Sequence, residues 1–223
     1  DEMLMPGLIN MHEHLITVES FDDLLIRPYW DEIGAKMLVR AQDLLNMGFT
    51  TVRDAGGWCL GIKRAIDDGT AVGPRILSPG GALTQTGGHA DFRLPYQNNP
   101  FFSPASEHPE HSMVQFFGGA RRADGVAEVR KATRANLAAG AHFIKVLGGG
   151  GIASPFDPLT SFQYSIEELK AAAEEASNYG TYATIHVHLD PAVNRAIDAG
   201  FKMIEHATCM KEDTAKRFAD EGI

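Results

Sequence analysis

Strand-like and helix-like stretches alternate six times along this chain, and this alternation restricts its fold more than any other feature. Each short apolar or β-branched run is followed by a longer segment whose apolar residues recur at helical spacing. The predicted strands span residues 7–15, 50–56, 74–81, 142–151, 182–188 and 202–208. The predicted helices span residues 31–47, 60–69, 124–140, 165–180, 190–200 and 211–222. Regular alternation of this kind is typical of α/β proteins with parallel strands.

Such a sheet is either open and doubly wound or closed into a barrel. A doubly wound nucleotide-binding sheet needs a glycine-rich turn after its first strand, and here that strand ends in the sequence His12-Glu13-His14. We therefore predict a TIM-type (β/α)8 barrel. All 223 residues are assigned to this one domain, with an irregular stretch at 82–122. Because only six units are recognisable, we expect a barrel truncated to about six β/α units, without strands seven and eight.

Charge and composition narrow the class of partner. The chain has 20 Lys and Arg against 29 Asp and Glu, a net charge of −9, and no basic run. Nucleic acid and anionic membranes are therefore poor partners, and a small-molecule substrate is expected. Cys59 and Cys209 lie far apart in sequence and indicate reduced thiols, although one disulfide is left open. With no visible membrane span or signal peptide, we expect a cytoplasmic protein. Homo-oligomerisation is left open.

Two histidines stand two positions apart at the end of the first predicted strand. Residues i and i+2 of a strand point to the same face, so His12 and His14 would direct their imidazoles toward one point. A metal ion bound by neutral ring nitrogens suits that arrangement. Two hydrogen-bonded structural histidines are the alternative.

Later strands bring further candidates to the same end of the barrel, where active sites of this fold lie. The fourth strand carries Lys145, the fifth ends with His186 and His188, and the sixth ends with His206. A single histidine at a strand end is usually structural. Five histidines at the same end of three strands favour a metal site.

Lys145 lies between Ile144 and Val146, and an ammonium buried there would be costly. The side chain could extend to the rim. It could form a Schiff base through a lowered pKa, as in a lyase or aldolase, with the glycines at 148–151 binding a phosphate. Alternatively, its charge could be removed chemically. The residues alone leave these three interpretations open.

Several motifs together resemble the amidohydrolase superfamily, and in particular its prolidase-like, imidazolonepropionase-like branch of metal-dependent carboxypeptidases. They are "PGLINMHEHL", "FIKVLGGGGIASPFDP", "TIHVH" and "MIEHAT", joined by "TTVRDAGG" and "ALTQTGGHADF". The resemblance extends from Met5 to about residue 210. It implies a barrel with a small β-sandwich domain, whose segments are absent here.

The resemblance also implies a centre of two zinc ions. The ligands would be His12 and His14 for the more buried ion, His186 and His206 for the second, and a bridging Lys145 carbamylated by CO₂.

Substrate contacts are implied less specifically. His188, His89 in "TGGHAD" and the hydroxyl of Tyr164 are the candidates, the last for a substrate carboxylate. A solvated loop histidine and a packing tyrosine are the alternatives for His89 and Tyr164. His108 and His111 are expected to be solvent-exposed.

The implied reaction is hydrolysis of the amide bond of a dipeptide or N-acyl amino acid by a metal-bound hydroxide. The family also has an aspartate at the end of strand eight that transfers a proton. No residue of this chain matches it, so we do not expect these residues alone to be active. The alternatives are a lyase or aldolase that uses Lys145 and an inactive barrel fragment.

Overall fold

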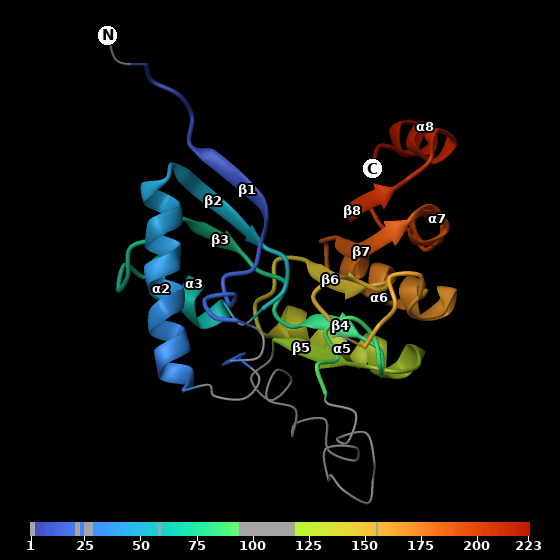
Figure 1. Cartoon of the computed structure of the whole chain (residues 1–223), viewed down its shortest axis with the longest axis horizontal. Helices are drawn as coiled ribbons and strands as arrows, with labels where there is room; N and C mark the ends of the chain where they lie inside the picture. The colour runs from blue at the N-terminus through green and yellow to red at the C-terminus, as the bar shows by residue number, and fades with distance from the viewer. Residues whose placement is uncertain (1–2, 21–22, 25–28, 58, 94–118, 155) are drawn as a thin grey trace, which may run out of the picture.

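Parallel strands, most of them followed by a helix on the outside, make up the computed structural model of the chain (Figure 1). The structure describes residues 3–20, 23–24, 29–57, 59–93, 119–154 and 156–223. His108 and His111 lie outside these residues. Every ladder between named strands is parallel, which confirms the predicted α/β class.

All six predicted helices are present. They are α2 (Trp30–Asn46), α3 (Leu60–Asp67), α5 (Val126–Ala138), α6 (Ile166–Asn178), α7 (Asp190–Asp198) and α8 (Glu212–Glu221). A capping box forms at the start of α6, with the backbone N–H of Glu168 donating to Ser165 Oγ at 3.3 Å. None of the described helices combines the length and the apolar character needed to cross a membrane.

The strands form two sheets. One has the order β1 (Leu8–Glu13), β2 (Phe49–Asp54), β3 (Arg75–Leu77). The other has the order β5 (Ala120–Arg122), β4 (Ala82–Thr84), β6 (Ile144–Leu147), β7 (Ala183–Leu189), β8 (Met203–Cys209). In Figure 1 the first sheet lies on the left with α2 and α3, and β7 and β8 lie on the right with α7 and α8.

The third predicted strand, residues 74–81, ends earlier in the structure, which corrects that prediction. β3 ends at Leu77 and pairs with β2, whereas β4 begins at Ala82 and pairs with β6. Between them, Pro79 has no N–H to donate to a ladder, and Gly80 has a φ of +68°. The same passage of chain therefore enters one sheet, bends, and continues in the other.

The stretch predicted to be irregular, residues 82–122, contains two short strands, and this is a second correction. β4 and β5 pair in parallel, with Ala82 opposite Ala120 and Thr84 opposite Arg122. Strands of three residues are too short to show a period in the sequence.

Each sheet has its own apolar core. Around β6 and β7 the core includes Leu83, Ile144, Val146, Ile185 and Val187, all buried. Around β2 it includes Leu15, Ile33, Met37, Val52 and Ile76. Because helices cover the outer faces, the C-terminal ends of the strands remain available for polar side chains.

Candidate active site

Side chains from both sheets line a cavity of about 260 Å³ at the C-terminal ends of the strands. Its polar lining includes His12, His14, His89, Lys145 and His186. Apolar residues complete the described lining, among them Ile16, Leu24, Trp30, Phe92 and Leu147. The structure thus brings the predicted strand-end residues of β1, β6 and β7 to one cavity.

The histidine rings form a continuous cluster. The ring centroids of His12 and His14 are 5.2 Å apart, and those of His12 and His206 are 4.8 Å apart. On the other side, His206 lies 4.5 Å from His186 and 4.7 Å from His188. The rings of β1 therefore meet those of β7 and β8 although they are far apart in sequence.

Three of these histidines could hold a single ion. Ring nitrogens of His186, His188 and His206 all lie within 4.8 Å of one another. Imidazole is a common ligand of zinc and other divalent metals. His188, expected only to contact substrate, is therefore also placed where it could bind a metal.

An irregular backbone presents His206. Both His206 and Ala207 have positive φ angles, +69° and +47°, a conformation that non-glycine residues rarely adopt. The register between β7 and β8 also shifts beyond Val187. Strained backbone of this kind is often retained where a side chain must take one position.

Lys145 is buried at the centre of the site, with 1% of its surface exposed. Its Nζ has no hydrogen-bond partner among the described residues. Burial lowers its pKa to about 7, against the opposing effect of Glu205. The side chain therefore does not extend to the rim, and a substantial fraction of it is a neutral amine near neutral pH. A neutral amine can react with CO₂ or with a carbonyl.

Hydrogen bonds fix the orientation of the two β1 histidines. Nδ1 of His12 lies 2.7 Å from Oε2 of Glu205, and Nδ1 of His14 lies 2.8 Å from the carbonyl oxygen of Gly56. We assign the proton to Nδ1 in both rings because each partner is an acceptor. Nε2 of each ring is then free to bind a metal, as is usual for histidine ligands.

Glu205 is a buried carboxylate that the sequence analysis missed. It contacts the guanidinium of Arg53 and accepts a hydrogen bond from Oγ1 of Thr184 at 2.5 Å. Burial favours its neutral form, but the hydrogen bond from His12 and the nearby charges of Lys145 and Arg53 outweigh burial and lower its pKa to about 2. Its position directly after the apolar residues Met203 and Ile204 of β8 could have identified Glu205 as a buried carboxylate from the sequence.

Burial also keeps the other histidines neutral. It is the main cause that lowers the pKa of His186 to about 2 and that of His206 to about 4, with Lys145 adding to both effects. Neutral imidazole is the form that binds metal ions. The electrostatics of the cavity therefore favour coordination over protonation.

His89 reaches the cavity from the loop after β4. Its ring stacks on that of His186, with centroids 4.4 Å apart and planes inclined by 15°. Its Nδ1 lies 3.0 Å from Oδ2 of Asp157, a buried residue that the sequence analysis also missed. His89 is therefore held against the site and is not a solvated loop histidine.

Tyr164 is placed differently. Its side chain is buried, its hydroxyl has no hydrogen-bond partner within the described part of the chain, and it is not among the described residues that line the cavity. Its carbonyl oxygen accepts a hydrogen bond from Arg195 at 2.7 Å. In this structure Tyr164 packs in the core near the site.

The glycine run at 148–151 serves the turn beside Lys145. The N–H groups of Gly148, Gly150 and Gly151 donate to His186 O, Ser161 O and Asp157 Oδ2 at 3.0, 3.2 and 2.9 Å. A Cβ on Gly150 would lie only 1.9 Å from the carbonyl oxygen of Pro158. Because these three N–H groups are already bonded, they are not available to a phosphate.

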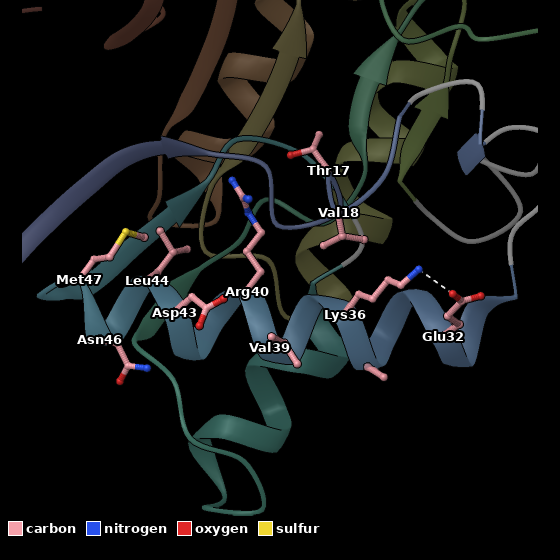
Figure 2. A pocket seen from close by; sticks show the side chains of 11 residues that line it. Thr17, Val18, Glu32, Lys36, Val39, Arg40, Asp43, Leu44, Asn46 and Met47 are labelled. Atoms are coloured by element: carbon pink, nitrogen blue, oxygen red, sulfur yellow. Dashed lines mark hydrogen bonds and ion pairs between the residues drawn. The ribbon is translucent and has the colours of Figure 1, made fainter.

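A larger hollow of about 990 Å³ runs along the outer side of α2 (Figure 2). Its lining includes the ion pair of Lys36 with Glu32, and no histidine is found among the described residues that line it. Glu13, between the two β1 histidines, points toward this helix, with Oε1 2.7 Å from a guanidinium nitrogen of Arg40. The cavity lined by the clustered histidines and Lys145 is the smaller of the two.

Residues 3–219 match the model of the amidohydrolase family. The chain belongs to the amidohydrolase family. The resemblance inferred from the sequence motifs is thereby confirmed.

Relatives of this amidohydrolase include the ochratoxinase of Aspergillus niger, which is 35% identical over 231 residues, covering 99% of this chain and 46% of that protein. A crystal structure of an amidohydrolase superposes with a TM-score of 0.87 at 39% identity, covering 98% of this chain and 52% of the other. A prolidase complexed with N-methylphosphonate-L-proline gives 0.86 and 35%, with the same coverages. The chain spans about half the length of these relatives.

The donor set of this amidohydrolase chain fits the divalent metals that the family generally binds. Histidine nitrogens converge from β1, β7 and β8, and a lysine nitrogen without a hydrogen-bond partner in the described residues lies beside them. Histidine nitrogen is a ligand type that suits zinc among other divalent ions.

Proposed function

We propose that this chain carries the metal site of a hydrolase that cleaves the amide bond of a dipeptide or an N-acyl amino acid. The observation that carries the proposal is the convergence of His12, His14, His186 and the buried Lys145 on a single cavity. The rings of His188 and His206 lie next to that of His186. The relatives named ochratoxinase and prolidase support a reaction at a carbon–nitrogen bond.

In this proposal His12 and His14 hold one divalent ion, most simply zinc, and His186 and His206 hold a second. Ions bound there would polarise the scissile carbonyl and lower the pKa of water. The chain's own contribution is to keep these imidazoles neutral and oriented. Glu205 and the carbonyl of Gly56 orient the β1 pair, and burial keeps His186 and His206 neutral.

Lys145 is proposed to bridge the two ions as a carbamate. The lone pair of its neutral Nζ would form a bond to the carbon of CO₂ while one C=O π bond of CO₂ opens onto oxygen, and the N–H proton would be released to water. The product is an anion with two oxygen donors, so the modification replaces an unpaired ammonium with a group that ligates metal. A pKa of about 7 makes the reactive amine available at neutral pH.

His89 and His188 are proposed to contact the substrate. Both lie against the ring of His186, with centroid separations of 4.4 and 4.8 Å. His188 Nδ1 is 3.0 Å from Oγ1 of Thr208, which fixes the ring at the edge of the cluster.

A Schiff-base enzyme remains the second candidate because Lys145 is a buried amine of lowered pKa. It has less support, since the glycine N–H groups are occupied and the histidines would have no role. Trapping of a substrate on Lys145 by borohydride would favour this candidate over the hydrolase.

Replacing Lys145 tests the proposal in the native protein that carries this chain. We expect Lys145→Met to fold, because an apolar side chain of similar length replaces a buried charge without a hydrogen-bond partner among the described residues. It should lose bound zinc by elemental analysis and lose hydrolysis of a panel of dipeptides and N-acyl amino acids. Lys36→Met, on the outer side of α2, is the control and should keep both. Unchanged metal content and hydrolysis in Lys145→Met would refute the assignment.

A further inference from the structure

A buried carboxylate contacts His89 at Nδ1. Asp157 is 6% exposed, and its Oδ2 accepts from three donors. These donors are His89 Nδ1 at 3.0 Å, the backbone N–H of Gly151 at 2.9 Å and Nε2 of Gln163 at 3.5 Å. Because this oxygen receives two other N–H groups, the hydrogen shared with the imidazole belongs to the histidine.

The surroundings leave His89 one position. Its backbone N–H donates to Oε1 of Gln163 at 2.8 Å, and its carbonyl oxygen accepts from Oγ1 of Thr84 at 2.6 Å. A Cβ on Gly151 would lie 2.2 Å from Cε1 of the ring, so the glycine provides the space that the imidazole occupies. The stacked ring of His186 covers the opposite face.

We propose that Asp157 is a positioning residue that holds His89 in the Nδ1–H tautomer, so that Nε2 is the hydrogen-bond acceptor presented to the substrate. A neutral imidazole has one donor nitrogen and one acceptor nitrogen. Fixing the donor toward Asp157 therefore fixes the acceptor toward the cavity. The complementary group is an N–H or O–H of the bound substrate. This role rests on the proposed hydrolytic function of the cavity.

Two substitutions separate the effect of the Asp157 acceptor oxygen on the His89 tautomer from the effect of the Asp157 charge. Asp157→Asn can place its amide oxygen where Oδ2 now accepts all three hydrogen bonds, so it keeps the acceptor and removes the charge. Asp157→Ala removes the acceptor. We expect ¹⁵N NMR of the histidine-labelled native protein to show Nδ1–H at His89 in the unmodified protein and in Asp157→Asn, and a mixture of tautomers in Asp157→Ala.

The kinetic constants should distinguish Asp157→Ala from Asp157→Asn in the same way. Losing one oriented hydrogen bond should raise KM about tenfold in Asp157→Ala with little change in kcat. Asp157→Asn should stay close to the unmodified protein, and His89→Ala should remove any further effect of Asp157→Ala. Zinc content should be the same in both Asp157 variants, because Asp157 contacts none of the proposed metal ligands.

Each failure has a distinct signature. An Nε2–H tautomer in the unmodified protein, or an unchanged tautomer in Asp157→Ala, would overturn the role of Asp157 whether or not any amide is hydrolysed. If Asp157→Ala does not fold, the tautomer of the unmodified protein and Asp157→Asn still decide. Absence of hydrolysis with the expected tautomers would reject the proposed function and leave the positioning by Asp157 standing, and binding of N-methylphosphonate-L-proline would then be compared among the variants.

Discussion

At the scale of single residues, Arg53 is a buried charged residue, outside the proposed metal ligands, that contacts two other strands. It is 2% exposed, donates from Nε to the carbonyl oxygen of Met11 at 2.7 Å, and pairs with Glu205. Its guanidinium carbon lies 5.3 Å above the ring of Phe143. One side chain on β2 thus connects β1 with β8.

Removing that charge should therefore destabilise the fold. We expect Arg53→Met to cost about 3–5 kcal/mol in the free energy of unfolding, because the Glu205 carboxylate would stay buried without its guanidinium partner. Arg40→Met, which breaks the more exposed pair with Glu13, should cost about 1 kcal/mol or less. Urea denaturation of the two variants measures the difference, and equal costs would contradict this account.

The residues of the site differ in how far the sequence could predict them. Histidines at strand ends are visible because a strand alternates its faces, and all five expected at the cavity are found near it. Glu205 and Asp157 were missed because their roles depend on partners 193 and 68 positions away. Tyr164 shows the opposite limit, since sequence cannot tell a hydroxyl that faces the cavity from one packed beside it.

At the scale of elements, α5 and α6 are joined by one acidic side chain. Glu175 on α6 accepts from Arg134 at 2.7 and 2.8 Å and from Arg130 at 2.7 Å, both on α5. The hydrogen bond from Arg134 is the main cause that lowers the pKa of Glu175 to about 2, against burial and with help from Arg130. The contact should therefore depend on pH.

The sign follows from the folded pKa being lower than the unfolded one. The stabilisation by Glu175 is fully present above about pH 4.5, the ordinary pKa of the group, and is lost as the pH falls toward 2. We expect Glu175→Gln to be less stable than the unmodified protein at pH 7, with the gap closing in acid. Glu174→Gln, which breaks a more exposed pair with Arg130, should change little. Thermal melts at several pH values test this, and a gap that widens in acid would oppose it.

Most elements were predictable because their patterns are long. Helices such as α2 and α6 show apolar spacing over several turns, and α6 also has its capping box. β4 and β5 were not predictable because each has three residues and pairs with a segment distant in sequence. The end of the third strand at Leu77 was not predictable either, because β3 pairs with β2 whereas β4 pairs with β6. Local sequence does not contain that information.

At the scale of the whole molecule, the proposed ligands lie on different sheets. His12 lies at the end of β1 in the three-stranded sheet and His14 directly follows that strand, whereas His186 and His206 belong to the five-stranded sheet. Ions bound by both sets would therefore stabilise the folded arrangement of the two sheets. Binding to the native state alone adds about 4 kcal/mol when the free ion is at a thousand times its Kd.

We accordingly expect chelation to lower the melting temperature of the native protein and zinc to restore it. His206→Ala should lose most of this zinc-dependent shift. His142→Asn should keep it, because His142 lies at the start of β6 and its Nδ1 accepts from the N–H of Ser78. Differential scanning calorimetry gives the shifts, and an undiminished shift in His206→Ala would exclude a ligand role for that histidine.

The bend between β3 and β4 is held in place by its neighbours. Gly81 O accepts from Asn136 Nδ2 at 2.6 Å, and Ser78 O accepts from the backbone N–H of His142 at 2.8 Å. The backbone between β3 and β4 thus links the two sheets. Hydrogen bonds hold it to α5 on one side and to the residues before β6 on the other. Rotation of one sheet against the other would have to break these hydrogen bonds. The linkage therefore restricts the distance between the two groups of histidines before any ligand binds.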